Sequence, residues 1–157
     1  MDMKKIKVLL KAKESEEQLA LRDHAAVVKV LDERTASLKE VMVEREKLEE
    51  EVKRYKRNAQ EGALQGKPVN EIQGFLKFAE SLEKKILELK KIETVKEKEC
   101  KQAQVRADHA EKDMVHARIE KRKVEVLLEQ KLQEERVRKY AEDEVLSEEI
   151  SQRKRNI

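Results

Sequence analysis

The sequence predicts an all-α protein in which two long helices form an antiparallel coiled-coil hairpin, the second helix being longer than the first. Three observations carry this prediction. The composition is that of a long helix, the helix-breaking residues are confined to one short segment, and apolar residues recur with a seven-residue period on both sides of it. We take these in turn and then ask what such a molecule could do.

The composition excludes an ordinary globular domain. Charged residues make up 45% of the 157 residues and aromatic residues only 3%, whereas a typical domain is about 25% charged. Such a composition is typical of a coiled coil when it is periodic and of disorder when it is not. The net charge is only +3, with both signs finely mixed, so no basic patch indicates a nucleic-acid partner.

The chain has one clear break. Its three glycines and single proline are Gly62, Gly66, Pro68 and Gly74, and the stretches 1–61 and 75–157 contain neither residue type. Glycine and proline interrupt helices, so the sequence predicts one hairpin domain over 1–157. We expect a first helix over about 2–59, a turn over about 60–69 and a second helix over about 70–150.

Each half keeps an unbroken 3-4 spacing of apolar residues, which predicts a left-handed supercoil with knobs-into-holes packing. Eleven of sixteen positions are apolar in the first half and fourteen of seventeen in the second. These seam positions are Ile6, Leu10, Lys13, Glu17, Ala20, His24, Val27, Leu31, Arg34, Leu38, Val41, Arg45, Leu48, Val52, Tyr55 and Ala59, and then Ile72, Phe75, Ala79, Leu82, Ile86, Leu89, Glu93, Lys96, Cys100, Ala103, Ala107, Ala110, Met114, Ala117, Lys121, Val124 and Leu128.

A short turn between long helices favours antiparallel packing within one chain. Placing Ala59 opposite Ile72 makes the numbers of facing residues add up to about 131. The second helix then outruns the first, and residues from about 126 onward are very polar, so we expect this overhang to be helical only when a partner binds it. The end with both termini, where small alanines face Lys13 and Glu17, is expected to be weaker and more mobile than the turn end.

No catalytic, cofactor-binding or metal-binding constellation is visible. Cys100 is the single cysteine and lies on the seam, where a small buried hydrophobe is its expected role. His24 also occupies a seam position, and His109 and His116 are expected at the surface. Their spacing of seven residues does not suit a metal pair on one helix. We therefore expect a protein that is not an enzyme.

Two ends of the predicted hairpin offer protein-binding candidates. Tyr55 and Phe75 fit the seam near the turn, whereas Phe78 does not. It is therefore either an exposed anchor for a partner or a residue that flanks the seam, and Leu76 and Lys77 would complete an exposed patch. The other end carries charge, with basic residues early in the first helix and late in the second, which is the pattern of a solvated face or of a contact with acidic side chains.

The sequence resembles the FliJ family of flagellar export proteins and the related YscO proteins of type III secretion injectisomes. The resemblance covers nearly the whole chain and rests on size and two-helix plan, on the initial segment KKIKVLLKAKESEE, on Tyr55-Lys56-Arg57-Asn58 before the turn, and on the stretches EIQGFLKFAESL and EKRKVEVLLEQKLQEERVRKYAEDEVLSEE after it. Lys85 and Leu89 depart from the family, in which a small residue and a histidine can stand at these positions.

The resemblance implies a central-stalk-like component of a type III protein export apparatus, similar to the γ stalk of rotary ATPases. Its terminal ends would insert into the hexameric export ATPase and activate it, its turn side would reach the cytoplasmic domain of the export gate protein, and export chaperones would be further partners. The implied gate contacts are Leu48, Tyr55, Phe75, Phe78 and Leu82, and the implied ATPase contacts are Lys4, Lys5, Lys7, Arg136, Arg138 and Lys139.

This interpretation predicts a monomer in the cytoplasm, held at the inner membrane only through the export apparatus and not inserted in the bilayer. No stretch of the sequence reaches the length of about 20 apolar residues that a spanning helix needs. The alternative is a structural or scaffolding coiled coil that acts through dimerisation and has no ATPase partner. A prefoldin-like chaperone subunit fits less well, because no β-hairpin sequence joins the two halves.

Overall fold

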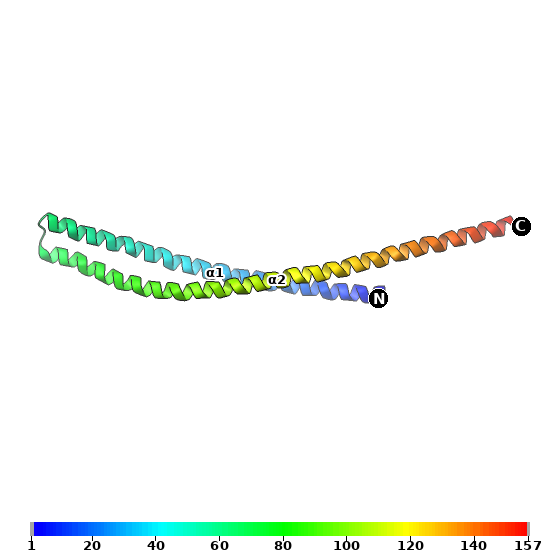
Figure 1. Cartoon of the computed structure of the whole chain (residues 1–157), viewed down its shortest axis with the longest axis horizontal. Helices are drawn as coiled ribbons and strands as arrows, with labels where there is room; N and C mark the ends of the chain where they lie inside the picture. Colours follow the sequence, from blue (N-terminus) through cyan, green and yellow to red (C-terminus); the bar gives the residue numbers. More distant parts are fainter. Residues whose placement is uncertain (1, 157) are drawn as a thin grey trace. The chain divides into compact units, whose positions relative to one another are not determined.

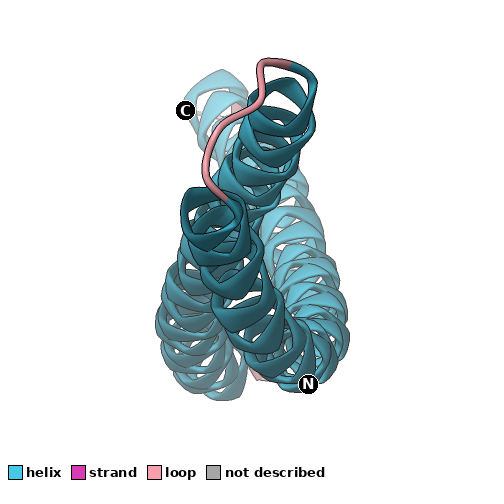
Figure 2. Cartoon of the chain, turned by 90° about the vertical axis from the view of Figure 1, so that its left-hand side faces the viewer, coloured by secondary structure: helices cyan, strands magenta, loops and turns pink. Residues whose placement is uncertain are grey.

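The computed structural model describes residues 2–156 and confirms the all-α hairpin. Helix α1 spans Met3–Leu64 and helix α2 spans Val69–Arg155, with 62 and 87 residues respectively, and the two helices pack against each other. They leave the connecting loop side by side (Figure 1), and the loop itself is a single short crossing between two helix ends (Figure 2). The chain divides into two compact units, one of residues 25–109 and one of residues 1–24 with 110–157.

The turn is shorter than the sequence suggested, since α1 ends at Leu64 rather than near residue 59. Gly62 lies inside the helix, where its missing side chain leaves room: an added Cβ would come within 3.4 Å of the Lys67 side chain and 3.7 Å of Ile72. Gly66, with φ at 72°, ends the helix. The amides of Gly66 and Lys67 donate to the carbonyls of Ala63 and Gly62, at 3.3 and 2.9 Å, which is the Schellman arrangement for closing a helix.

Pro68 directly precedes α2. It has no amide hydrogen to leave unpaired, and its carbonyl accepts from the amides of Glu71 and Ile72. Gly74, the last glycine of the break, is inside α2 with open space around it. The connection between the two helices therefore consists of only four residues, 65–68.

The predicted seam is confirmed. Every one of the seam positions named above is buried or half-buried, in both helices. Within residues 25–109 the tightest cluster consists of Val52, Ala79 and Ile86, against which Leu48, Tyr55 and Leu82 pack. Within residues 1–24 and 110–157 the buried apolar side chains are Ile6, Ala110 and Val124. Cys100 and His24 are half-buried on the seam, and His109 and His116 are exposed, as expected.

The expectation that the overhang needs a partner to be helical is wrong, because α2 continues as a helix to Arg155. Its residues are mostly Glu, Lys, Arg, Gln and Leu, all of which have a high helix propensity. Ion pairs at helical spacing add a little more: Lys131 lies 3.5 Å from Glu134, and Arg138 lies 3.9 Å from Glu142. Residues 136–156 are nevertheless all exposed, so this last part of α2 packs on no other part of the described chain.

Candidate protein-binding surfaces

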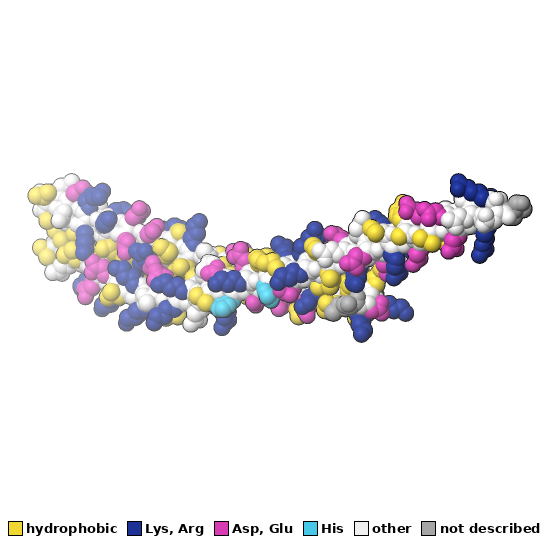
Figure 3. Space-filling view, turned by 45° about the vertical axis from the view of Figure 1, so that its right-hand side comes forward, with side chains coloured by type: hydrophobic (Ala, Val, Ile, Leu, Met, Phe, Trp, Pro, Cys, Tyr) yellow, Lys and Arg dark blue, Asp and Glu magenta, His cyan; other side chains and the backbone are white. Residues whose placement is uncertain are grey.

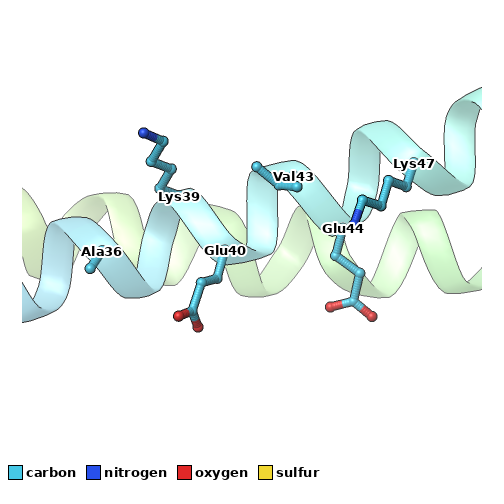
Figure 4. A pocket seen from close by; sticks show the side chains of 6 residues that line it. All are labelled: Ala36, Lys39, Glu40, Val43, Glu44 and Lys47. Atoms are coloured by element: carbon cyan, nitrogen blue, oxygen red, sulfur yellow. The ribbon is translucent and has the colours of Figure 1, made fainter.

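The hollows on the helices are shallow. One of them, with a volume of about 470 Å³, is lined by Ala36, Lys39, Glu40, Val43, Glu44 and Lys47. All six side chains come from α1, and they leave the helix in different directions instead of converging (Figure 4). Such a surface can contact a protein but does not enclose a small molecule. Within residues 2–156 no three His, Cys, Asp or Glu side chains gather to hold a metal ion.

Several polar residues of the seam have a polar partner on the other helix. Glu93 is 9% exposed, and both oxygens of its carboxylate accept hydrogen bonds from Arg45, at 2.6 and 3.3 Å. Arg45 also donates to Glu49 at 3.0 Å. The hydrogen bonds to the two carboxylates raise the pKa of the Arg45 guanidinium above its ordinary value. This two-point contact fixes direction as well as distance.

A second ion pair across the seam, with a single contact, lies in the unit that contains the termini. The Lys121 ammonium lies 3.2 Å from the Glu17 carboxylate, and this contact raises the pKa of Lys121. Two further polar seam residues reach across within residues 25–109. Lys96 donates to the Ser37 hydroxyl, and Arg34 donates to the backbone carbonyl of Glu99 at 3.2 Å.

In both ion pairs the residue numbers add up to 138. Residues that face each other directly, in one layer of the coiled coil, have numbers that add up to about 131; we call this the layer rule. The ion pairs therefore join residues one heptad further apart than the layer rule predicts. Side chains on a helix lean towards its N-terminus. In an antiparallel pair the two helices lean in opposite directions, so Arg45 and Glu93 meet midway between their own layers, near the level of Val41 and Leu89. Long side chains therefore pair one heptad apart while the helix backbones keep the predicted register. The aromatic rings of Tyr55 and Phe75, which fit the layer rule directly, lie 6.4 Å apart.

The candidates at the turn end fall into two groups. Leu48, Tyr55, Phe75 and Leu82 are half-buried seam residues, and three of them pack on the apolar cluster around Val52. Phe78 alone is 62% exposed.

The sequence left two roles open for Phe78, and the structure shows that its ring both flanks the seam and is exposed. Its ring stacks on the Tyr55 ring, with 5.7 Å between the centroids and 16° between the planes, and its outer face remains open to solvent. An exposed ring held in one orientation by a half-buried neighbour is well suited to anchor a partner. Other large apolar side chains are exposed nearby in the sequence, namely Leu64, Val69 and Leu76, and apolar atoms gather at the end of the hairpin where the loop lies (Figure 3).

The charged candidates are all exposed. Lys4, Lys5 and Lys7 lie on the first turns of α1, and Arg136, Arg138 and Lys139 lie on α2, all within the unit that contains both termini. Lys4 and Lys5 border a shallow groove of about 460 Å³ whose floor is Val8, Leu9 and Ala12. The sequence analysis missed this groove. The signal in the sequence was Val8, an apolar residue that does not fit the seam; in the structure its side chain is 69% exposed.

Comparison with known proteins adds no assignment: no family model, no curated protein and no solved structure matches this chain. None of the helices in the part of the chain that the structure describes is apolar enough over a sufficient length to cross a membrane.

Proposed function

We propose that this chain is a non-enzymatic, central-stalk-like component of a type III protein export apparatus. In this role the terminal ends of the hairpin insert into the hexameric export ATPase and activate it, and the turn end links it to the cytoplasmic domain of the export gate protein. Export chaperones are further partners of the same molecule. Its site of action is cytoplasmic, at the inner membrane. The resemblance to the FliJ and YscO families motivates this proposal.

The observation that best supports a hairpin acting as a single chain is the pairing of its seam charges. Arg45 with Glu93 and Glu17 with Lys121 are complementary only when α1 packs antiparallel on α2. In a parallel, in-register dimer each of these residues would face its own copy, and like charges would meet in a half-buried seam. That argument disfavours the simplest scaffolding dimer and favours a two-helix hairpin used as a monomer.

The two kinds of surface suit two kinds of partner. The unit with both termini presents exposed lysines and arginines, which would contact acidic side chains of the ATPase ring. The turn end presents the exposed ring of Phe78, which would enter an apolar pocket of the gate. Activation requires that the hairpin bind one state of the ring better than another, because only differential affinity shifts an equilibrium.

The primary test measures ATP hydrolysis and ring assembly of the export ATPase from the same organism, with and without the purified chain. We expect faster hydrolysis and more hexamer. A triple variant, Lys4→Glu, Lys5→Glu and Lys7→Glu, should lose this stimulation while keeping its helical circular-dichroism signal. No change in either hydrolysis or assembly with the wild-type chain would contradict the proposal.

The turn end is tested separately with Phe78→Ala. We expect weaker binding to the isolated cytoplasmic domain of the export gate protein and a loss of about 1 kcal/mol of stability, the usual worth of one aromatic stack. Leu87→Ala is the matched control, since it also removes an exposed apolar side chain from α2 but breaks no stack and lies outside the patch around Phe78. A loss of several kcal/mol on Phe78→Ala would make Phe78 a core residue and not a contact.

A further inference from the structure

The start of α1 carries an apolar strip on the side that faces away from the seam. Val8 follows the buried seam residue Ile6 by two positions, which is about 200° around the helix, and its side chain is 69% exposed. Ala12 and Leu19 lie four and eleven residues beyond Val8, so they share its side of α1, and Leu19 is 60% exposed. We call Val8, Ala12 and Leu19 the outer strip. The shallow groove of about 460 Å³ described above lies at its beginning.

Four exposed lysines border the outer strip, namely Lys4, Lys5, Lys7 and Lys11. Residues 2–13 hold five lysines and one aspartate, which gives this stretch a net charge of +4. The nearby Glu16 is paired with Lys13 at 3.3 Å. Glu17 is paired with Lys121 across the seam. Within residues 2–156 none of the four bordering lysines forms an ion pair, so their charge is not neutralised by the described chain.

A second groove on α1 has nearly the same volume but a different charge balance. It measures about 470 Å³ and is lined by Ala36, Lys39, Glu40, Val43, Glu44 and Lys47. Its two lysines are balanced by two glutamates, and its apolar residue Val43 is 41% exposed. An anionic surface is therefore attracted to the groove at the start of α1 and not to this one.

The shape and the residue types of the outer strip favour a lipid bilayer over a folded protein. All of its residues come from one helix, so the strip is convex, and a protein partner would need a matching concave surface. The interface of a bilayer accepts an amphipathic helix that lies in its plane. The four cations are all lysines, whose flexible apolar stems allow the ammonium groups to reach lipid phosphates. Fixed carboxylates are bound more specifically by the planar fork of arginine.

We propose that the first turns of α1 form a peripheral binding site for an anionic lipid bilayer. The helix lies parallel to the surface, with Val8, Ala12 and Leu19 at the acyl-chain boundary and the bordering lysines among the phosphates. The seam is undisturbed, because Ile6 and Leu10 are covered on the opposite side of α1. No helix in the described part of the chain is apolar enough to span a bilayer, so the contact is superficial and reversible.

This inference goes beyond the proposed function and does not depend on it. Lys4, Lys5 and Lys7 are also among the residues proposed to contact the ATPase, so the ring and the bilayer compete for the same side of α1. A bilayer-bound population would be a store of the chain close to the membrane, from which the ring recruits it.

The test is flotation of the full chain with vesicles, made either of phosphatidylcholine alone or with about 30 mol% phosphatidylglycerol as the anionic lipid. We expect binding to the anionic vesicles only, and a bound fraction that falls as salt is raised from about 0.1 M to about 0.5 M. Val8→Glu should raise the dissociation constant for anionic vesicles at least about tenfold. The matched control is Val43→Glu, which makes the same change in the charge-balanced groove and should bind like the wild type.

A second matched pair isolates the charge. Lys4→Gln with Lys5→Gln should weaken binding, whereas Lys39→Gln with Lys47→Gln, which removes as many charges from the other groove, should not. All four positions are exposed, so circular dichroism should show unchanged helix content.

Three results would overturn the proposal. The first is a wild-type chain that binds no anionic vesicles or binds phosphatidylcholine equally well. The second is a loss of binding that is the same for each variant and its matched control. The third is a chain that is dimeric without lipid and becomes monomeric on Val8→Glu, because a second copy would then cover the strip. The vesicles contain no ATPase, so failure here leaves the proposed function standing.

Discussion

The region of residues 25–109 and the region formed by residues 1–24 with 110–157 share one seam pattern but fill it differently. In the first, Val52, Ile86 and their half-buried neighbours Leu48 and Leu82 supply large branched side chains. In the second, small alanines and charged residues occupy many of the same positions, and α2 runs on beyond the start of α1. The repeat therefore sets the register in both regions, whereas side-chain volume sets how firmly each is held.

The largest expected consequence is a gradient of amide hydrogen exchange. We expect strong protection for residues near Val52 and Ile86, intermediate protection near Ile6 and Val124, and almost none for residues 136–156. Local opening costs range from near zero in helix ends to the full stability in the core. Exchange measured by mass spectrometry on peptides of both helices checks this. Equal protection near Ile86 and near Val124 would remove the difference between the two regions.

A matched pair of substitutions sharpens the comparison. Ile86 and Ile6 are 7% and 0% exposed, so Ile86→Ala and Ile6→Ala delete the same atoms from equally buried sites. We expect Ile86→Ala to cost about 3 kcal/mol, the middle of the range for such deletions. Ile6→Ala should cost about 1 kcal/mol, because the first turns of α1 open locally before the rest unfolds. Urea unfolding of both variants measures this, and equal costs would contradict it.

The seam ion pair of residues 25–109 gives the next effect. Arg45→Ala should lower the thermal midpoint by several degrees, because it leaves the nearly buried Glu93 carboxylate without its partner. The double variant Arg45→Glu with Glu93→Arg should recover part of the loss, since the pair is rebuilt in reverse. The single variants Arg45→Glu and Glu93→Arg are measured beside it. If the double variant loses as much stability as these two single variants added together, the two charges are not coupled.

The same residues show how much of the structure could be predicted from the sequence. The seven-residue rhythm predicted which side of each helix is covered, and it did so even for Arg45 and Glu93, because polar residues at seam positions still obey the period. The pairing of Arg45 with Glu93 was missed, since the layer rule places Arg45 opposite Ile86. Only the lean of each side chain towards its own N-terminus brings the two charges together.

The local structure near the turn was the other feature that the sequence did not predict. The sequence showed the break but not its length, because a glycine either ends a helix or is accommodated within one. Gly62 stays within α1, with the side chains of Lys67 and Ile72 lying beside it, whereas Gly66 ends α1 through its positive φ. Likewise, the exposure of Phe78 and its stack on Tyr55 depend on tertiary packing that no period encodes. The partner-binding roles stay predictions, since they concern molecules outside the chain.

The smallest expected effect separates the two seam pairs by pH. Glu17 raises the pKa of Lys121 above its ordinary 10.5, so this pair stabilises the fold fully below about pH 10.5 and loses its contribution as pH rises through the elevated pKa. Arg45 keeps its charge over the same range. Lys121→Arg should therefore flatten the fall in thermal midpoint between pH 10 and pH 12, whereas Lys121→Gln should lower the midpoint at neutral pH and remove the same dependence. Because the variants differ from the wild type only at residue 121, the difference between their curves isolates this pair. Parallel curves would mean that the Glu17–Lys121 contact adds nothing to the stability of the terminal end.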